Sequence, residues 1–461
     1  MPTRPNILIL GLGQFAKGSG ISAALFFARQ KTNVRVTDQK TEQDLASNVA
    51  RLKRFKNVKF ILGKHRLEDI RWADIIVRNP RVRPSSPEMR LATRLGKRVE
   101  SDVSLFMARC PCPIVGITGT RGKSTTTALV GEMLKRSGKR VWIGGNILVS
   151  PLTFLNKVRK GDIVVLELSS WLLETTGNLG LSPHVAVVTN IMRDHLNSYE
   201  GMDDYVEAKA QIFRHQRPDD IVILNADDEN CRRFAEEAPS RVLTFSSKYR
   251  DADAMLTVRD MNWKDPKTGT RGILLKRKDV KILGEHNALN VLAASLTARV
   301  AGATVSGIRS ATKDFTGLEN RLETIATIRG VRYVNDTTAT TPDAVIAAIK
   351  SLAPVSKRIH LIAGGTDKEL EFEDVASVIK RFPVTVSLFE GSAIKKFSDA
   401  LNRVGVPFVR VPDMKSALEF HMRDAKKGDT ILLSPGCTSF GMFKNEFDRG
   451  EQFKALVRRL K

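Results

Sequence analysis

The sequence predicts an α/β fold of three tandem domains, and two observations support this prediction. The chain has 461 residues, which suits two to four domains at about 100–200 residues each. Strand patterns and helix patterns alternate along it, and the alternation starts afresh near residues 6, 114 and 313. Such alternation is typical of βαβ units, in which helices cover a mostly parallel sheet.

The first domain is predicted over residues 1–107 and is Rossmann-like. An apolar run at 6–13 ends in glycines, a helix follows at 21–29, and further strands are expected at 34–38 and 74–79. The glycines stand at positions 11, 13, 18 and 20, which is not the G-x-G-x-x-G spacing of dinucleotide-binding proteins. This spacing argues against NAD as a ligand.

The second domain is predicted over residues 108–312, with a mostly parallel sheet of the P-loop ATPase kind. A strand at 114–119 leads into a helix at 123–137, and strands follow at 163–169, 185–191 and 221–225. Short strands are expected between 240 and 283, before a helix at 288–300.

The third domain is predicted over residues 313–461 and is again Rossmann-like. A hairpin at 324–335 turns at Arg329-Gly330, and strand-helix repeats have strands at 359–364, 384–389, 408–411 and 430–434. A final helix is expected from about residue 444.

Composition excludes several classes of protein. Apolar residues make up 42% and charged residues 27%, which is ordinary for a globular protein and excludes collagen-like and disordered chains. Four cysteines are too few for a disulfide scaffold in a chain of this length. No run approaches the roughly 18 apolar residues of a membrane helix, and the N-terminus does not resemble a signal peptide. We therefore expect a cytoplasmic protein with no membrane partner.

The formal net charge of +24 favours anionic ligands. The basic residues are dispersed in short groups, and only 4 Trp and 4 Tyr are present, so no aromatic-interleaved basic stripe exists for single-stranded nucleic acid. Nucleic acid is not expected as a partner. A basic P-loop ATPase that binds nucleic acid stays open as an alternative from another class.

A phosphate-binding loop is predicted at residues 116–125, Gly-Ile-Thr-Gly-Thr-Arg-Gly-Lys-Ser-Thr, between a strand and a helix. Glycines there let successive backbone N–H groups face phosphate oxygens, and the helix N-terminus adds its dipole. Lys123 can reach the β- and γ-phosphates, and the hydroxyl of Ser124 or Thr125 can hold Mg²⁺. The general pattern has a further glycine five residues before Gly122, where this chain has Ile117, so the loop has the form T-G-T-x-G-K-S.

Two further side chains lie where strands end. Glu167 closes an apolar strand, and the carboxyl end of a parallel strand is where α/β sheets present ligands. A carboxylate there can hold Mg²⁺. His195 follows the next strand and is a candidate second metal ligand. In the first domain, Asp38 lies about 20 residues beyond Gly18, as a ribose contact does.

Separated stretches of the chain resemble the Mur ligase superfamily, and within it the branch that adds glutamate to UDP-N-acetylmuramoyl-L-alanine. They follow the order of that family over almost the whole chain: Glu167-Leu-Ser-Ser-Trp171, Asn190-Ile-Met-Arg-Asp-His195, Ala208-Lys-Ala-Gln-Ile-Phe213, Gly284-Glu-His-Asn-Ala-Leu-Asn290, Gly317-Leu-Glu-Asn-Arg-Leu-Glu323, Asn335-Asp-Thr-Thr-Ala-Thr340, Gly364-Gly-Thr-Asp-Lys368 and Leu433-Ser-Pro-Gly-Cys-Thr-Ser439. The first domain matches least well.

The resemblance implies residues for ATP and for two Mg²⁺ ions. ATP would contact Gly119, Thr120, Arg121, Gly122, Lys123, Ser124, Thr125, Asn287, Asn290, Arg321 and Asp336. Helix capping is an alternative role for Asn287. The metal ligands would be Ser124, Glu167, His195 and Lys209, the last carrying a carbamate formed from CO₂. The catalytic residues implied are Lys123, Lys209, His195 and Arg321.

The resemblance also implies substrate contacts. Gly13, Asp38 and Asn146 would bind the UDP-sugar, and Thr340, Lys368 and Ser439 would bind glutamate. The activity implied is ATP-dependent ligation through an acyl phosphate in peptidoglycan precursor synthesis, by a monomer. D-glutamate is the expected acceptor, with L-glutamate or another amino acid as the alternative.

Three departures from the family pattern bear on these contacts. Asn79-Pro80-Arg81 stands where Ser-Pro-Gly is usual, and Lys444-Asn-Glu-Phe447 replaces Lys-Asn-Phe near the amino-acid site. Thr338 replaces a lysine, so the glutamate pocket has one cation fewer, which Arg449 or Lys444 could replace.

Overall fold

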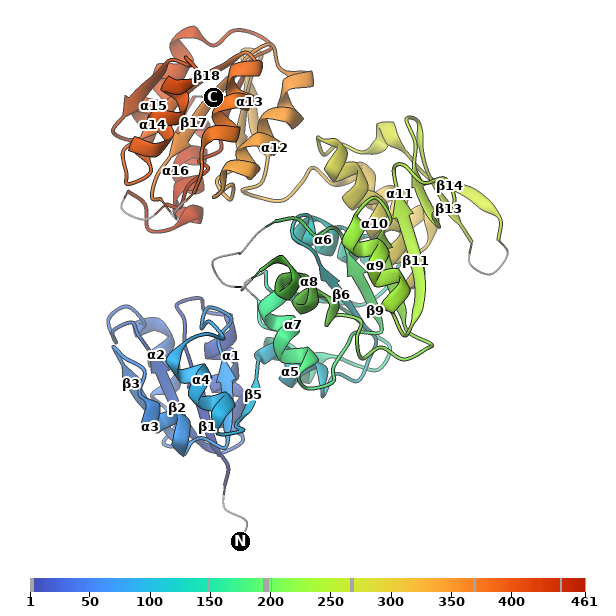
Figure 1. The fold of residues 1–461 in the computed structure, drawn as a ribbon, viewed down its shortest axis with the longest axis vertical. Coiled ribbons are helices and arrows are strands. Elements are labelled where there is room, and N and C mark those ends of the chain that lie inside the picture. Colours follow the sequence, from blue (N-terminus) through green and yellow to red (C-terminus); the bar gives the residue numbers. More distant parts are fainter. Residues whose placement is uncertain are drawn as a thin grey trace. The chain divides into compact units, whose positions relative to one another are not determined.

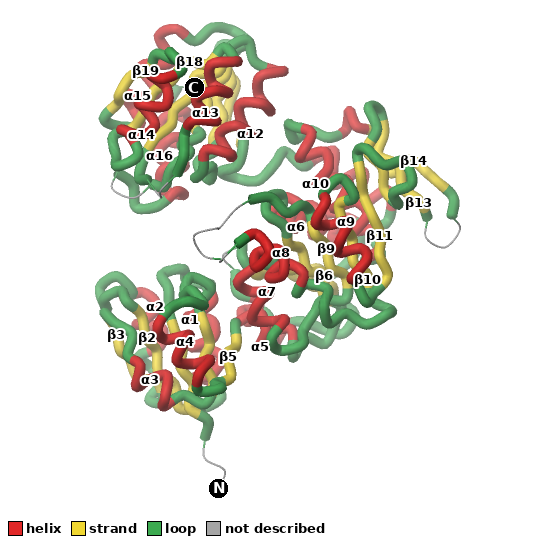
Figure 2. Tube along the Cα trace, viewed as in Figure 1, coloured by secondary structure: helices red, strands yellow, loops and turns green. Residues whose placement is uncertain are grey.

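The computed structural model describes residues 4–147, 149–193, 199, 201–265, 269–367, 370–439 and 442–460. It divides into two compact units, of which the first comprises residues 1–280 and 288–314 and the second residues 281–287 and 315–461. The first unit holds two sheets and the second holds one, and the strands of each are mostly parallel (Figures 1 and 2). The predicted α/β class with three sheets is confirmed.

The N-terminal sheet has five parallel strands in the order β3 (Val58–Leu62), β2 (Asn33–Asp38), β1 (Asn6–Leu10), β4 (Ile75–Arg78) and β5 (Arg98–Glu100). Its helices are α1 (Ser19–Arg29), α2 (Ala46–Leu52), α3 (Leu67–Trp72), α4 (Pro87–Arg94) and α5 (Asp102–Met107). Leu8, Ile9 and Leu10 are buried because β1 is the central strand, with neighbours on both sides and helices above and below.

The central sheet has nine strands, in the order β14 (Arg271–Lys276), β13 (Asp260–Lys264), β12 (Ala254–Leu256), β11 (Arg241–Ser246), β10 (Ile221–Asn225), β9 (Val185–Val188), β6 (Ile114–Thr118), β8 (Ile163–Glu167) and β7 (Val141–Gly145). Strands β7 to β12 pair in parallel, and β13 and β14 add an antiparallel hairpin at one edge. The β-rich patch predicted at 240–283 is this edge. The helices are α6 (Lys123–Arg136), α7 (Ser170–Gly177), α8 (Met202–Ala210), α9 (Glu229–Glu237), α10 (Glu285–Val300) and α11 (Val305–Asp314).

The sheet of the second unit has six strands in the order β15 (Glu323–Ile328), β16 (Val331–Asn335), β20 (Thr430–Leu433), β17 (Ile359–Gly364), β18 (Val384–Phe389) and β19 (Phe408–Val411). Only β15 and β16 pair antiparallel, as the predicted hairpin. The helices are α12 (Pro342–Leu352), α13 (Glu373–Arg381), α14 (Ile394–Arg403), α15 (Met414–Asp424) and α16 (Glu446–Arg458).

Helix α16 begins two residues later than predicted because the Asn445 side chain caps it, accepting hydrogen bonds from the backbone N–H groups of Phe447 and Asp448. Across the described ranges, no helix is long and apolar enough to cross a membrane.

Candidate active site

The predicted phosphate loop connects β6 to α6 at the carboxyl end of the central sheet. Gly119 and Gly122 both have positive φ angles, of +145° and +84°. A Cβ atom at Gly119 would lie 2.0 Å from Thr189 Oγ1, and one at Gly122 would lie 2.2 Å from Asn290 Oδ1, so only glycine fits at either position. Helix α6 starts without a side-chain cap, which leaves its first backbone N–H groups available to an anion.

The two residues that follow β9 hold this loop in place. Thr189 Oγ1 donates to the carbonyl oxygen of Arg121 at 2.6 Å. Asn190 Oδ1 accepts from Arg121 N at 2.9 Å, and Asn190 Nδ2 donates to Arg121 O at 3.0 Å. The sequence analysis assigned no role to either residue. The signal was their position directly after a strand that neighbours β6.

Two lysines converge on one carbonyl oxygen of the loop. Lys123 Nζ donates to Gly119 O at 2.8 Å and to Thr120 O at 3.0 Å. Lys209 Nζ, from α8, donates to the same Gly119 O at 3.0 Å and lies 4.6 Å from the centre of the Tyr205 ring. Two ammonium groups this close repel each other, and a polyphosphate would relieve that repulsion.

The environment of Lys209 differs from that of an ordinary surface lysine. Lys209 is only 1% exposed to solvent. A carbonyl oxygen and an aromatic face are partners that suit an ammonium group. His195, the other predicted metal ligand near this helix, lies outside the described residues.

Glu167 ends β8 beside the loop, paired in register with Ile117 of β6. The residue is 2% exposed, and its Oε1 accepts a hydrogen bond from Asn146 Nδ2 at 3.0 Å. Its Oε2 has no hydrogen-bond partner in the part of the chain that the structure describes. A buried carboxylate oxygen without a donor is costly, and a hard cation such as Mg²⁺ is a suitable partner.

The donor set around Glu167 is therefore incomplete without further ligands. Among the described residues no group of three or more His, Cys, Asp and Glu side chains is arranged so that it could hold a metal ion. Ser124 follows Lys123 on the first turn of α6, as predicted. Asn146, predicted to bind the UDP-sugar, donates a hydrogen bond to Glu167 in this structure, so it can orient that carboxylate.

The N-terminal sheet has its own strand-to-helix loop, between β1 and α1. Gly13 N donates to Asp38 Oδ2 at 2.9 Å, and Lys40 N donates to Asp38 Oδ1 at 2.9 Å. From the other side, Asn79 Nδ2 donates to Gly11 O at 3.1 Å. Gly13 and Asp38, both predicted to contact the UDP-sugar, thus contact each other, and the Asp38 carboxylate orders the loop.

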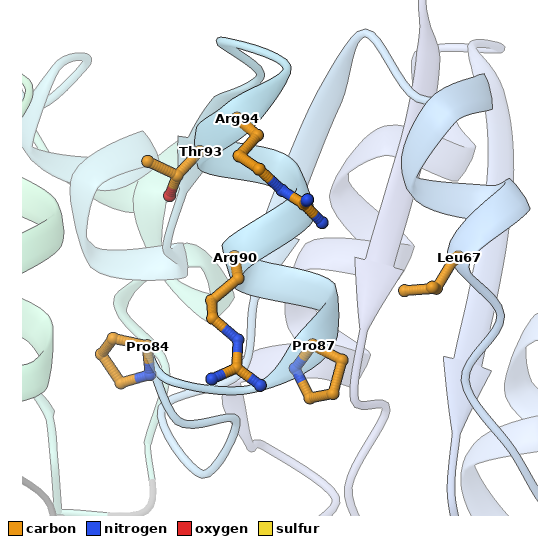
Figure 3. A pocket seen from close by; sticks show the side chains of 6 residues that line it. All are labelled: Leu67, Pro84, Pro87, Arg90, Thr93 and Arg94. Atoms are coloured by element: carbon orange, nitrogen blue, oxygen red, sulfur yellow. The ribbon is translucent and has the colours of Figure 1, made fainter.

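A hollow of about 580 Å³ lies between α3 and α4 of the same domain. Figure 3 shows Arg90 and Arg94 on one helix and Leu67 on the other, and the remaining lining residues are Pro84, Pro87 and Thr93. None of these six residues belongs to a predicted site.

In the second unit, Asp336 follows β16 and is 5% exposed. Its Oδ1 accepts from Leu322 N at 3.1 Å, and its Oδ2 accepts from Ser434 Oγ at 2.9 Å. Arg321, which precedes Leu322 in the chain, is exposed. Burial and, to a smaller extent, the Arg321 guanidinium lower the pKa of His286.

The two asparagines of α10 have different surroundings. Asn287 is in the first turn, where its Nδ2 donates to Leu283 O at 2.7 Å. Asn290 is buried, and its side chain lies against Gly122 of the phosphate loop. Asn290 therefore lies against the predicted phosphate loop, and the nucleotide contact of Asn287 stays a prediction.

The predicted glutamate contacts are partly described. Thr340 is half-buried, Lys368 lies outside the described residues, and Ser439 is 3% exposed. The Ser439 hydroxyl oxygen has no hydrogen-bond partner within the described ranges of the chain. A buried hydroxyl of this kind can donate to a ligand carboxylate.

Arg449 does not replace the missing cation of this pocket. It is fully buried, and its guanidinium donates to Thr337 O at 2.8 Å and to Cys437 O at 3.3 Å. Burial lowers the pKa of Arg449 to about 10. Because its donors are directed at two backbone carbonyls and the Thr337 hydroxyl, Lys444 is the better candidate for the extra charge.

Family comparisons match three consecutive parts of the chain. Residues 5–101 match the Mur ligase MurD-like N-terminal domain, residues 117–298 match the Mur ligase middle domain, and residues 320–437 match the Mur ligase glutamate ligase domain.

Similar proteins extend over nearly the whole chain. A UDP-N-acetylmuramoylalanine–D-glutamate ligase from Roseiflexus sp. (strain RS-1) is 42% identical over 98% of this chain and 97% of its own length. The enzyme of the same name from Symbiobacterium thermophilum is 38% identical over 96% and 97%.

Solved structures share the fold at lower identity. The MurF ligase of Thermotoga maritima in complex with ADP has a TM-score of 0.64 and 17% identity, covering 99% of both chains. The UDP-N-acetylmuramate–alanine ligase of the same organism has a TM-score of 0.61 and 20% identity, covering 99% of this chain and all of its own.

Proposed function

The chain belongs to the Mur ligase family, and we propose that it is the ATP-dependent ligase that adds D-glutamate to UDP-N-acetylmuramoyl-L-alanine. The observation that carries this proposal is the 42% identity to a D-glutamate ligase over almost the full length of both chains. The reaction forms an amide bond in peptidoglycan precursor synthesis.

The reaction has two steps in this proposal. The L-alanine carboxylate of the nucleotide sugar attacks the γ-phosphorus of ATP, which gives an acyl phosphate and ADP. The neutral amine of glutamate then attacks the acyl carbon, and inorganic phosphate leaves from the tetrahedral intermediate. The first step builds negative charge on phosphoryl oxygens, so its rate depends on cations and N–H donors placed around them.

The phosphate loop supplies such groups. Lys123 is half-buried at the start of α6, where its ammonium group can leave Gly119 O for a phosphate oxygen. The uncapped N–H groups of α6 are the second source of positive potential. Asn290, which packs on Gly122, would hold the nucleotide close to the loop.

Magnesium suits the oxygens that this site provides. Glu167 Oε2 and the Ser124 hydroxyl would hold an ion, and His195 and Lys209 would complete the sites of two ions. Bound Mg²⁺ neutralises phosphate charge. A carbamate on Lys209 is part of the proposal, since it would exchange an ammonium group for the oxygen ligands that Mg²⁺ prefers.

The second unit would supply the remaining contacts. Arg321, exposed after the Gly317–Asn320 turn, would reach the phosphates, and Asp336 would help to seat the nucleoside while it orders the backbone at Leu322. Thr340, Lys368 and Ser439 would bind the two glutamate carboxylates. Closure of domains around the substrates would exclude water from the acyl phosphate. The monomeric state and the cytoplasmic location stay predictions.

A ligation assay tests the proposal. Purified protein receives ATP, Mg²⁺ and UDP-N-acetylmuramoyl-L-alanine, with D-glutamate, L-glutamate, L-lysine or diaminopimelate in parallel, and both ADP and the amide product are measured. We expect product and matching ADP with D-glutamate. Preference for another amino acid would refute the assigned acceptor, and ATP hydrolysis stimulated only by DNA or RNA would favour the nucleic-acid ATPase.

A further inference from the structure

Arg78 joins the N-terminal sheet to the central domain. It is the last residue of β4 and is 4% exposed. The next residue, Asn79, donates to Gly11 O of the β1–α1 loop at 3.1 Å. Arg78 therefore ends the strand from which the predicted UDP-sugar loop is held.

The guanidinium of Arg78 contacts mainly the other domain. Its Nη2 donates to Trp171 O at 2.7 Å and to Thr175 Oγ1 at 3.0 Å, both on α7. Its Nη2 also lies 3.6 Å from Glu174 Oε2 of the same helix. Within its own domain, Nη1 donates to Val82 O at 3.2 Å.

Helix α7 begins three residues after Glu167, with Ser169 as its N-cap. The backbone between Glu167 and Ser169 is therefore fixed at one end by β8 and at the other by α7. The buried Arg78 side chain therefore contacts two segments at once. One is the turn at 79–82, and the other is α7, which follows the candidate metal ligand Glu167.

The electrostatics of this contact make it a poor source of stability alone. Burial lowers the pKa of Arg78, an effect that the Glu174 carboxylate opposes. Burial also raises the pKa of Glu174. The cost of removing both charges from water often equals or exceeds their attraction, so packed apolar side chains would serve stability as well.

We propose that Arg78 is a positioning residue for the ligation reaction, through its simultaneous contacts to the 79–82 turn and to α7. The inference rests on the proposed function, in which the UDP part of the nucleotide sugar is bound at the β1–α1 loop. The reacting L-alanine carboxylate of the same substrate lies near the phosphate loop that binds ATP. One substrate then spans both domains, and a small error in their relative placement moves the carboxylate away from the γ-phosphate. Arg78 fixes that placement.

The test compares two arginines of the N-terminal sheet. Arg78→Met removes the contact to α7, and Arg35→Met is the control, because Arg35 pairs with Asp69 of its own domain at 2.8 Å. We expect Arg78→Met to lower kcat/KM for the nucleotide sugar by about 10²-fold, with the KM for ATP unchanged. Arg35→Met should leave both constants unchanged. Arg78→Lys, which keeps the charge, should recover part of the lost kcat/KM.

A double variant separates positioning from stability. Arg78→Met with Glu174→Leu removes the buried guanidinium and its partly buried carboxylate partner, so the melting temperature should return toward that of the wild type. The loss in kcat/KM should persist in the double variant. Recovery of activity together with stability, or equal behaviour of Arg78→Met and Arg35→Met, would overturn the proposal. Failure of the wild type itself to ligate D-glutamate would instead refute the proposed function.

Discussion

Two strand-to-helix loops of this chain have the same position in their sheets but differ in the hydrogen bonds that they receive from the neighbouring strand ends. The β1–α1 loop lies between the ends of β2 and β4, and the β6–α6 loop lies between the ends of β8 and β9. Side chains from both neighbouring strand ends, Asp38 and Asn79, hydrogen-bond to the first loop. For the second loop, the side-chain hydrogen bonds described above come from one neighbouring end, at Thr189 and Asn190 directly after β9.

The other neighbour of the second loop is Glu167. Its carboxylate is held by Asn146 through one oxygen, while the other oxygen has no donor in the described part of the chain. The first loop also has no lysine like Lys123 after its last glycine, since Ser19 and Gly20 lead into α1. The first loop is a backbone surface ordered by a carboxylate. The second loop contacts the ammonium groups of Lys123 and Lys209, and the Glu167 carboxylate beside it is our proposed ligand for a cation.

Lys123→Ala should have the largest effect on the second loop. The substitution removes the ammonium group closest to the phosphate-binding backbone, so kcat should fall by about 10³-fold. Because Lys123 is half-buried and its ammonium group bonds to carbonyl oxygens of the phosphate loop, the melting temperature should change little. A steady-state ligation assay with a thermal melt measures both. A kcat within about tenfold of the wild type would remove Lys123 from the catalytic groups.

Lys209→Ala should follow with a loss of about 10²-fold, since mutated groups around a metal site typically cost this much. If Lys209 carries a carbamate, short carboxylic acids should restore part of the activity, and the wild type in ¹³C-bicarbonate should show a carbamate signal by NMR. Lys209→Arg is the control, because it keeps the positive charge but cannot form a carbamate. A fully active Lys209→Arg enzyme would disprove the carbamate.

Asp38→Ala should affect the first loop more weakly. It removes the acceptor of two backbone N–H groups, so the KM for the nucleotide sugar should rise by about tenfold, while the KM for ATP stays constant. Asp74→Ala is the matched control, because Asp74 also accepts from a backbone N–H, that of Asn6, but at the amino ends of β1 and β4, away from the loop. An equal rise in the KM of both variants would show that the loop is not specifically involved.

Thr189→Val should have the smallest effect. The substitution removes the hydrogen bonds from Thr189 Oγ1 to Arg121 O and to Thr118 O, which would cost about 1 kcal/mol each in loop stability. The Asn190 side chain still hydrogen-bonds to both the N–H and the carbonyl oxygen of Arg121, so kcat should fall by only about 3-fold. Activity as low as that of Lys123→Ala would mean that the loop depends on Thr189 far more than its bonds suggest.

Much of this arrangement could be predicted from local sequence. Each loop follows an apolar strand and contains glycines, and Glu167 ends a strand, so the fold class, the phosphate loop and the candidate metal ligand needed no knowledge of tertiary contacts. The branch of the family followed from separated motifs taken together.

The contacts that order the loops could not be predicted in this way. The role of Asn190 depends on β9 being the neighbour of β6, and Asn146 reaches Glu167 only because β7 is beside β8. Arg78 meets α7 more than 90 residues later in the chain. Strand order is a property of the whole sheet, so spacing along the sequence does not encode it.

Binding of Mn²⁺ in place of Mg²⁺ tests whether the carboxylate beside the second loop binds a metal ion while the carboxylate of the first loop does not. Electron paramagnetic resonance counts free Mn²⁺ as the ion is titrated into the protein with a non-hydrolysable ATP analogue, for the wild type, Glu167→Gln and Asp38→Ala. We predict that Glu167→Gln weakens Mn²⁺ binding by about 10–100-fold, while Asp38→Ala binds like the wild type. Unchanged affinity in Glu167→Gln would show that the free carboxylate oxygen beside the phosphate loop does not hold the metal.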